Sequence, residues 1–266
     1  MHKIKILALA VLIGLLAFSF SVSAESVNVV KNGSFEEEFI NGVGKYWHAF
    51  NNGGYASYGY HDDTWSKTVY DGQHSQLIEI HTKAVGGSQP DRYTGIYQVV
   101  DVVPGARYMF SFYGMVRSTE GSEEKSKWNY RVQVGFDYNG GTDPWAVTEW
   151  VEMPWPEYPR LSPGVFQAYA HGITPTTDKL TIFIRVWKKF PTVGHEADIN
   201  IDAVSLVGPN PAQAQPAAET TQPAEETPKE SGMPKTGAHS ALPFVGLGLA
   251  LVAITLTSLR LIRQER

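Results

Sequence analysis

The sequence predicts an all-β domain with the architecture of an antiparallel β-sandwich or jelly roll. Segments 96–102, 108–117, 130–138, 180–187 and 199–207 alternate apolar and polar residues with a period of two, as half-buried strands do. Clusters of Gly, Pro and Asn separate them, and the region shows no convincing 3.6-residue apolar period. Many strands joined by turns, without helices to cover a parallel sheet, favour a sandwich.

The chain begins with a segment that does not belong to this domain. Lys3 and Lys5 precede an apolar run over 6–20, and Val22 and Ala24 occupy the positions of a small-residue cleavage site. We therefore expect residues 1–24 to be a signal peptide and the protein to be exported. The alternative is an uncleaved membrane anchor.

The other end of the chain has three parts. Residues 209–232 are rich in Pro, Ala, Gln, Thr and Glu and predict a disordered, extended linker. Residues 233–266 contain an apolar stretch over 241–259, long enough for one hydrophobic helix to cross a membrane. Arg260, Arg263 and Arg266 follow it, which is the basic flank expected on the cytoplasmic side.

The motif Met-Pro-Lys-Thr-Gly at 233–237, with the hydrophobic span and the basic tail, resembles the cell-wall sorting signal of Gram-positive-type surface proteins. The resemblance implies that a sortase cleaves between Thr236 and Gly237 and joins the protein to the cell envelope. Met233 stands where that family usually has Leu, a substitution that conserves volume. The alternative is a permanent single-span anchor, and either one predicts display on the cell surface.

Residues 25–208 remain as the globular domain, and all seven Trp and all thirteen Tyr of the chain lie within it. The sequence has no cysteine, which excludes disulfides, thiol nucleophiles and cysteine metal sites. With 22 basic and 27 acidic residues, the chain has a net charge of −5 and lacks the basic surplus that binding to nucleic acid requires.

Several motifs follow one another in a specific order along this domain. They are Asn-Gly-Ser-Phe-Glu at 32–36, Trp47, Asp-Gly-Gln-His-Ser at 71–75, Ile-Tyr-Gln-Val-Val at 96–100 before Pro104-Gly105, and a closing Ile-Asn-Ile-Asp-Ala-Val-Ser-Leu at 199–206. In this order they resemble carbohydrate-binding modules of the galactose-binding-like jelly-roll type. The resemblance covers essentially the whole domain and implies a non-catalytic module whose partner is a polysaccharide or another glycan.

The strand faces opposite the predicted core carry residue types that bind sugars. Aromatic rings cover the apolar face of a pyranose, and planar polar groups reach its hydroxyls. The residues that we expect on these faces are Tyr113, Arg117, Arg131, Gln133, Arg185 and Trp187. They place an arginine on each of three strands that we expect to be neighbours on one face. The alternative is that these arginines pair with acids on an ordinary solvated face.

A second candidate region is the loop around Gly-Gly-Thr-Asp-Pro-Trp at 140–145. Asp143 before Pro144 favours a turn, and Trp145 is followed by Trp150 and Trp155. We expect Asp143 and Trp145 to contribute to the ligand site. The three tryptophans form either a stacking platform or a small core for the loop itself.

The resemblance also implies a structural calcium ion beside the first and last strands. Carried over to this sequence, its ligands are Glu36 and Asp202, with Ser34, Asp71 and Ser75 as backbone or side-chain contributors. Oxygen ligands suit calcium, and a metal would help a domain without disulfides. Ala203 replaces the second of two adjacent Asp in the family motif. The alternative is that these acids pair with Lys or Arg.

Together these observations predict a cell-surface module that attaches the cell to a glycan and is not an enzyme. One alternative is a surface-coat or protein-adhesion domain without a sugar site, because a fold does not fix a function. The second is a glycoside hydrolase, which needs two opposed carboxylates. The sequence offers these carboxylates for that role: Asp137, Asp143, Glu149, Glu152 and Glu157.

Overall fold

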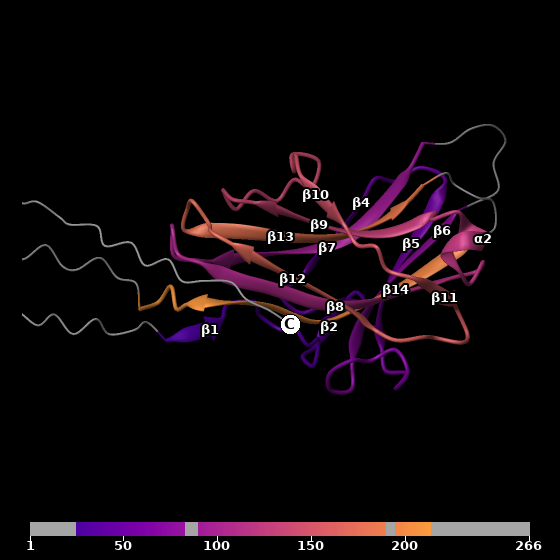
Figure 1. The fold of residues 1–266 in the computed structure, drawn as a ribbon, viewed down its shortest axis with the longest axis horizontal. Helices are drawn as coiled ribbons and strands as arrows, with labels where there is room; N and C mark the ends of the chain where they lie inside the picture. The colour runs from indigo at the N-terminus through magenta and orange to yellow at the C-terminus, as the bar shows by residue number, and fades with distance from the viewer. Residues whose placement is uncertain (1–24, 83–89, 190–194, 214–266) are drawn as a thin grey trace, which may run out of the picture. The chain divides into compact units, whose positions relative to one another are not determined.

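In the computed structural model, residues 25–82, 90–189 and 195–213 are described, and they form two β-sheets packed face to face (Figure 1). The predicted signal peptide, the sorting motif, the hydrophobic helix and most of the linker lie outside these residues, so they stay predictions. No helix in the described part of the chain is long and apolar enough to cross a membrane.

The secondary structure is almost entirely β-strand, with a single short helix among the described residues. In chain order the elements are β1 (Ser26–Asn28), β2 (Phe39–Ile40), β3 (Val43–Gly44), β4 (His48–Asn51), β5 (Ala56–Asp63), β6 (Ser75–Thr82), β7 (Arg92–Asp101), β8 (Tyr108–Ser118), α2 (Glu123–Ser126), β9 (Tyr130–Asp137), β10 (Trp150–Glu152), β11 (Glu157–Pro159), β12 (Gln167–Ile173), β13 (Lys179–Lys188) and β14 (Glu196–Pro209).

The strands divide between two large sheets. The first sheet has the order β11-β8-β14-β6-β5, with β12 also paired to β8 and β1 to β14. The second has the order β10-β9-β13-β7-β4, and β2 and β3 form a small separate ribbon. All pairs are antiparallel except β11 with β8. The fold is the predicted sandwich of jelly-roll type, so the predicted fold class is confirmed for the domain.

The alternation in the sequence becomes the division between core and surface. Successive side chains of a strand point to opposite faces, so every second residue of β8, β9, β13 and β14 enters the space between the sheets. The large side chains that this space buries completely include Tyr108, Phe110, Phe112, Ile182 and Ile199. The five alternating segments correspond to β7, β8, β9, β13 and β14, which confirms those strand predictions.

The closing strand β14 holds the first sheet together. One of its edges pairs with β8 and the other with β6 and then β1, so it lies in the interior of the sheet. The register with β8 shifts between Asp202 and Ser205, where Ala203 has a φ of 46°. This bulge turns Val204 and Leu206 back into the core, both buried at 1% exposure or less. Because β1 and the end of β14 are paired, the two ends of the domain lie side by side.

One prediction about the sheets is wrong. We expected the strands carrying Arg117, Arg131 and Arg185 to be neighbours on one face. Instead β8, with Arg117, belongs to the first sheet, whereas β9 and β13 pair in the second. The reason is that β8 and β9 follow one another in sequence but cross from one layer of the sandwich to the other, which their separate alternation patterns do not reveal.

Candidate functional site

The outer surface of the second sheet carries a continuous group of aromatic side chains around one arginine, which we call the aromatic face. Strands β7 and β13 supply its centre, because their residues that alternate with the buried ones point outward. The residues of the aromatic face are Phe50, Tyr93, Tyr97, Trp145, Trp150, Phe183, Arg185 and Trp187. Phe183 is fully buried beneath the others.

Arg185 lies at the centre of this face on β13. Its guanidinium carbon is 3.5 Å from the centroid of the Trp150 ring and 4.4 Å from that of Tyr93. Its Nε donates to Oε1 of Gln133 at 2.8 Å, across the pair between β13 and β9. Gln133 is 6% exposed, so a buried amide fixes the direction of the guanidinium. The predicted ligand residues Gln133 and Arg185 are therefore in direct contact.

The aromatic rings pack closely on the sheet because glycines lie beneath two of them. A Cβ at Gly135 would come within 3.0 Å of Trp150, and one at Gly95 within 2.8 Å of Phe50. Both glycines are members of strands, where glycine otherwise weakens the pairing. Their positions allow the rings of Trp150 and Phe50 to lie directly against the backbone of the strands.

Trp187 and Tyr93 form the second half of the face. Their rings stack with centroids 6.0 Å apart and an interplanar angle of 17°. The indole Nε1 of Trp187 donates to Asp91 at 2.9 Å, which fixes the ring. Burial raises the pKa of Tyr93, and the charge of Arg185 lowers it in part, so the phenol remains neutral at physiological pH.

The loop before β10 brings Trp145 to this face. Asp143 accepts a hydrogen bond from the backbone N–H of Trp145 at 2.9 Å, the turn that its sequence predicted. Trp145 is 50% exposed and contacts Phe50 and Tyr93 edge-on. Trp155, in contrast, is buried in the main core. Of the three tryptophans, Trp145 and Trp150 therefore belong to the aromatic face and Trp155 to the main core. They do not form a separate core for the loop.

Arg131 lies at the margin of the aromatic face and has an acidic partner. Its Nε donates to Glu152 at 2.7 Å, and its guanidinium lies 4.6 Å from the centroid of the exposed Trp128 ring. Lys189 approaches the same Glu152 at 3.8 Å and the ring of Trp187 at 4.2 Å. The alternative that we left open for the arginines, pairing with an acid, therefore holds for Arg131 but not for Arg185.

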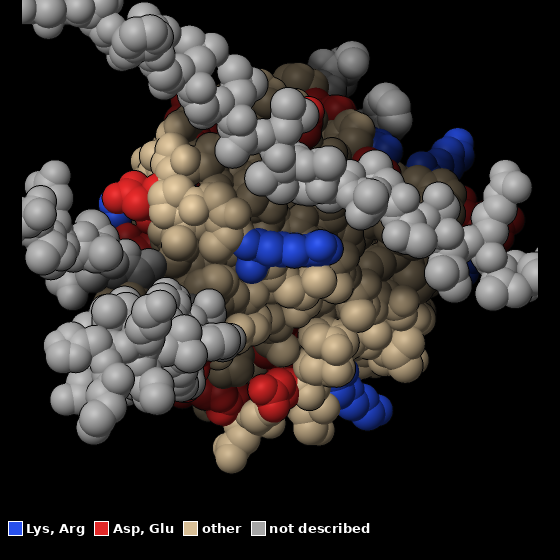
Figure 2. Space-filling model, turned by 60° about the vertical axis from the view of Figure 1, so that its left-hand side comes forward, with Lys and Arg blue, Asp and Glu red and all other residues tan. Residues whose placement is uncertain are grey.

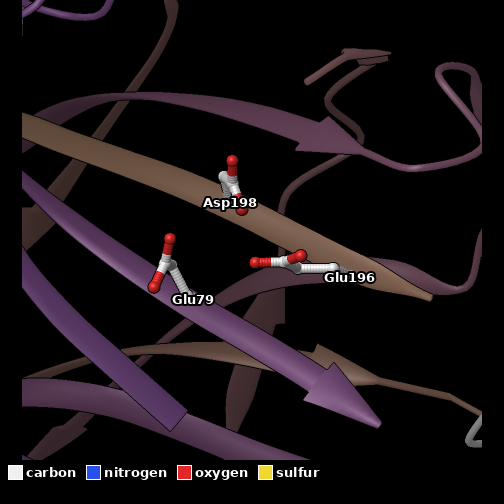
Figure 3. Close-up of side chains that lie close together, drawn as sticks. All are labelled: Glu79, Glu196 and Asp198. Atoms are coloured by element: carbon white, nitrogen blue, oxygen red, sulfur yellow. The ribbon is translucent and has the colours of Figure 1, made fainter. Parts of the chain in front are cut away.

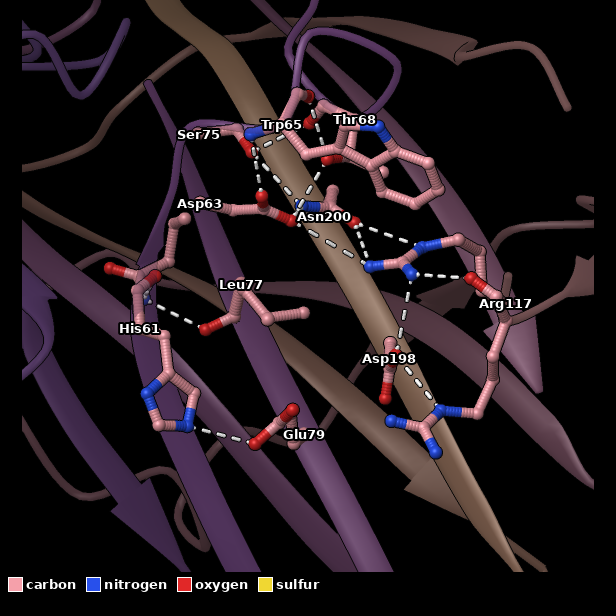
Figure 4. Close-up of polar contacts among 12 residues, drawn as sticks. His61, Asp63, Trp65, Thr68, Ser75, Leu77, Glu79, Arg117, Asp198 and Asn200 are labelled. Atoms are coloured by element: carbon pink, nitrogen blue, oxygen red, sulfur yellow. Dashed lines mark hydrogen bonds and ion pairs between the residues drawn. The ribbon is translucent and has the colours of Figure 1, made fainter. Parts of the chain in front are cut away.

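Arg117 belongs to a different environment, on the outer surface of the first sheet (Figure 4). We call this surface the polar face and define it by Asp63, Glu79, Arg117, Asp198 and Asn200. The guanidinium is 3.3 Å from Asp198 and donates to the side-chain oxygen of Asn200 at 2.9 Å. Burial lowers the pKa of Arg117, and the neighbouring Asp198 and Asp63 oppose that shift. Arg117 is only 4% exposed and lies outside the aromatic face.

Tyr113 also lies on the outer surface of the first sheet. Its ring stacks on that of Tyr70, with centroids 3.7 Å apart and an interplanar angle of 15°, and Tyr70 is 47% exposed. The structure thus brings together Arg131, Gln133, Asp143, Trp145, Arg185 and Trp187 on one side of the sandwich. Tyr113 and Arg117 lie on the other side, so the predicted ligand residues do not form a single group.

The polar face contains one cluster of acids that sequence reasoning missed (Figure 3). Carboxylate oxygens of Glu79, Glu196 and Asp198 lie within 4.8 Å of one another, and no other group of three acids or imidazoles in the described ranges converges in this way. Arg160 pairs with Glu196 at 2.7 Å and with Asp198 at 3.0 Å, and His61 bonds Glu79 at 2.8 Å. The cluster is therefore an ion-pair network on the sheet.

The residues of the predicted calcium site meet around the loop 70–74. One carboxylate oxygen of Glu36 accepts from the backbone N–H groups of Gln73 and His74, at 2.8 and 2.9 Å. One carboxylate oxygen of Asp202 accepts from those of Tyr70 and Asp71, at 2.8 and 3.1 Å. The two acids thus connect one loop to the segment between β1 and β2 and to the last strand, β14.

A calcium site requires several oxygen ligands that converge on one point. Ser34, Glu36 and Asp71 line a hollow of about 450 Å³. However, Glu36, Asp71 and Asp202 do not converge as the acids of the polar face do. The hydroxyl of Ser75 donates to the carbonyl of Thr68 at 2.7 Å and is buried. These contacts do not by themselves assemble a calcium site, so calcium binding stays a prediction.

Four of the five carboxylates that we considered for a hydrolase are engaged or buried, while Glu149 is exposed. Glu152 is paired with Arg131, while Asp137 and Asp143 accept from nearby backbone N–H groups. Glu157 is 3% exposed and accepts from two serine hydroxyls, and burial raises its pKa. None of these contacts sets two opposed carboxylates across the aromatic face.

The surface offers a few further hollows. The largest that we find in the described part of the chain has a volume of about 490 Å³ and lies between residues 40–49 and Tyr60. It reaches His48, whose ring stacks on Tyr97 at 5.1 Å and so borders the aromatic face. On the side of the molecule in Figure 2, uncharged side chains predominate and the charged ones lie mostly toward its margins.

Sequence reasoning missed Phe50, Tyr93 and Tyr97 as site residues. The alternation of segment 96–102 already placed Tyr97 on the face opposite Ile96 and Gln98, so the signal for it was present. Tyr93 lies before that segment, in a part of β7 (Arg92–Asp101) that we did not assign to a strand. Phe50 lies in the four-residue strand β4, which is too short to show a period.

The comparisons with known proteins concern the fold. No protein-family model matches the chain, and no curated protein matches its sequence. Solved structures do match. One is a family 61 carbohydrate-binding module in complex with β-1,4-galactotriose, at 14% identity and a TM-score of 0.40, covering 68% of this chain and 97% of that one. Another is a family 4 carbohydrate-binding module, at 15% identity and a TM-score of 0.37, covering 68% and 99%.

A third match has a different role. It is a cleaved adhesin domain of Lys-gingipain from Porphyromonas gingivalis, at 14% identity and a TM-score of 0.39, covering 69% of this chain and 99% of that one. At such identities and scores, no residue's role can be carried over to this chain.

Proposed function

We propose that this protein is a non-catalytic carbohydrate-binding module, displayed on the cell surface, and that the aromatic face binds the glycan. The observation that carries the proposal is the cluster at Arg185, where Trp150, Tyr93 and Gln133 contact one guanidinium. Rings that lie against a sheet match the apolar face of a sugar, and the guanidinium and amide match its polar groups.

The segments predicted at the two ends of the chain would place the domain at the cell surface. A signal peptide over 1–24, a linker over 209–232 and a sorting signal with Thr236-Gly237 would export the domain and hold it at the envelope. Sortase and the cell envelope are then its partners at the C-terminal end. Cleavage is checked by mass spectrometry of the wall fraction, where a chain ending at Thr236 is expected and a chain retaining 237–266 contradicts it.

The absence of catalysis is also part of the proposal. It is supported by the carboxylates described above, which serve ion pairs, turns and a buried serine network rather than an open pair. Incubation with a bound polysaccharide should release no reducing ends, and release that depends on Glu149 or Glu152 would contradict this.

Glycan binding is tested by affinity electrophoresis of the purified full-length protein in gels that contain different polysaccharides. We expect at least one polysaccharide to retard the protein. The variant Trp150→Ala removes a ring from the aromatic face, and we expect a loss of affinity of about two- to tenfold, since a stacked ring contributes about 0.5–1.5 kcal/mol.

The matched control is Trp65→Ala. Trp65 is also a partly exposed tryptophan near an arginine, with its ring centroid 5.9 Å from Arg117, but it lies on the polar face. This variant should be retarded like the original protein. Loss of binding in both variants, or retardation by no polysaccharide, would contradict a sugar site on the aromatic face and favour protein adhesion.

A further inference from the structure

Arg185 has no acidic partner. Among the described residues, no Asp or Glu lies within ion-pair distance of its guanidinium, and its one side-chain hydrogen bond is to the neutral Gln133. The internal segments outside the described residues, 83–89 and 190–194, contain no acidic residue. This half-buried cation is therefore not neutralised by a carboxylate of the domain it belongs to.

Three other arginines that lie against the two sheets differ in this respect. Arg117 faces Asp198 and Asp63, Arg160 faces Asp198 and Glu196, and Arg131 faces Glu152. Arg92, at the start of β7, also has no ion pair among the described residues, but it is only 5% exposed and so is less accessible to a ligand than Arg185. Burial of a charge is costly unless it is paired. Burial lowers the pKa of Arg185 to about 10, which is still well above neutral pH, so the group is a cation under ordinary conditions.

The contacts of Arg185 leave one part of the guanidinium available. Its Nε is taken by Gln133, and the rings of Trp150 and Tyr93 lie against the group. The two Nη groups make no hydrogen bond to any described residue. A carboxylate fits such a pair of terminal N–H groups, because it accepts two parallel hydrogen bonds in one plane.

We propose that the glycan bound by the aromatic face is acidic and that the Nη groups of Arg185 bind the carboxylate of a uronic acid residue. This inference rests on the proposed function and names its ligand class. The pyranose ring of the same sugar would lie on the neighbouring aromatic rings, and Gln133 would hold the guanidinium in position for the carboxylate.

The surroundings of the site agree with an anionic ligand. Lys189 lies 4.2 Å from the ring of Trp187, and Arg131 lies on the adjacent strand opposite Trp187. The nearby acids are already engaged, Glu152 with Arg131 and Asp91 with the indole of Trp187. This local basic character stands out in a chain whose net charge is −5.

The experiment compares acidic polysaccharides with neutral forms of the same chains. Full-length protein is run in gels with polygalacturonate or alginate, with the methyl ester of each, and with a sulfated galactan. We expect the carboxylated forms to bind at least about tenfold more tightly than their esters, because hydrogen bonds between two charged groups are stronger than those to a neutral ester. The variant Arg185→Gln should lose this preference, whereas Arg185→Lys should keep part of it.

The control variant is Arg107→Gln, an exposed arginine outside the aromatic face, which should keep the preference. Equal retardation by acid and ester, or by neutral polysaccharides alone, would overturn the acidic ligand while leaving the proposed sugar site intact. Retardation by the sulfated galactan alone would overturn the carboxylate assignment. Retardation by none of these or any other polysaccharide would overturn the sugar site as well.

Discussion

Each outer face of the sandwich carries an arginine within a strand, but the side chains that contact the two arginines differ. On the polar face, Arg117 is buried among Asp63, Asp198 and Asn200 (Figure 4). On the aromatic face, Arg185 meets two rings and an amide and no acid. The difference separates an arginine that its own carboxylates hold in place from a half-buried one whose terminal nitrogens have no partner among the described residues.

The largest expected effect is on the stability of the polar face. Arg117→Met removes the guanidinium from Asp198 and leaves a buried carboxylate with fewer partners, which costs about 3 kcal/mol of unfolding free energy. For a domain of this size, that corresponds to a fall in Tm of roughly 6–12 °C. Differential scanning calorimetry measures it.

The matched variant for that comparison is Arg185→Met. It leaves no acid unpaired but removes the donor to the buried Gln133 amide, so we expect a smaller loss of about 1–2 kcal/mol, from that hydrogen bond and the contact with the rings. Equal destabilisation by the two variants would show that the faces do not differ as described. A stable Arg117→Met that no longer binds glycan would reverse the assignment of the two arginines.

A smaller effect concerns pH. Burial raises the pKa of Asp202 from its ordinary value of 3.8 to about 6, against the backbone hydrogen bonds that lower it. A carboxyl with a raised pKa in the folded state binds its proton more tightly there than in the unfolded state. The contribution of Asp202 to stability therefore improves as the pH falls from about 6 to 4, and the cost of its charge is fully present above pH 6.

The variant Asp202→Asn isolates this contribution, because Asn is neutral at every pH. The difference in unfolding free energy between original and variant should change by about 1–3 kcal/mol between pH 7 and pH 4, with the original gaining on acidification. Denaturant titrations at several pH values give this difference. A difference that stays constant with pH would contradict it.

The same pair of proteins tests the calcium prediction. A bound cation favours the charged carboxylate, so added calcium should raise the Tm of the original protein at neutral pH and have less effect on Asp202→Asn. Equal Tm values with calcium and with a chelator would contradict calcium binding by these residues. The aromatic face should bind its glycan in both cases.

The smallest expected effect sharpens the description of the aromatic face. Asp143→Ala removes the acceptor that holds the backbone N–H of Trp145, so the exposed indole is less firmly placed. We expect a fall in glycan affinity of about two- to fivefold, corresponding to roughly 0.5–1 kcal/mol for one exposed hydrogen bond. Isothermal titration measures it, and an unchanged affinity would place Trp145 outside the site.

The sequence predicts the strands better than it predicts which strands are neighbours. The alternation in β8, β9 and β13 follows from which residues of each strand are buried. It places Arg117, Arg131 and Arg185 on the strand faces that point away from the core. Which sheet a strand joins depends on pairing between segments far apart in the sequence, such as β8 with β14. The alternation of residues within one strand does not show which other strands pair with it. For this reason Arg117 was grouped with residues on the opposite side of the molecule.

The site was predicted in part for the same reason. Gln133, Arg185 and Trp187 follow from alternation, whereas the contact of Arg185 with Trp150 depends on how the short strand β10 pairs with β9. The absence of an acid beside Arg185 is likewise a property of the packed sheets. Composition alone gave no reason to distinguish it from the other arginines.

The position of β14 in the interior of its sheet has a mechanical consequence. A pull on the C-terminal end of the domain, while a ligand is held on the opposite sheet, acts along a strand bonded on one edge to β8 and on the other to β6 and β1. The hydrogen bonds that join β14 to its neighbours would be sheared together. At an edge strand, in contrast, the hydrogen bonds can open one at a time. We therefore expect a high unfolding force along this direction.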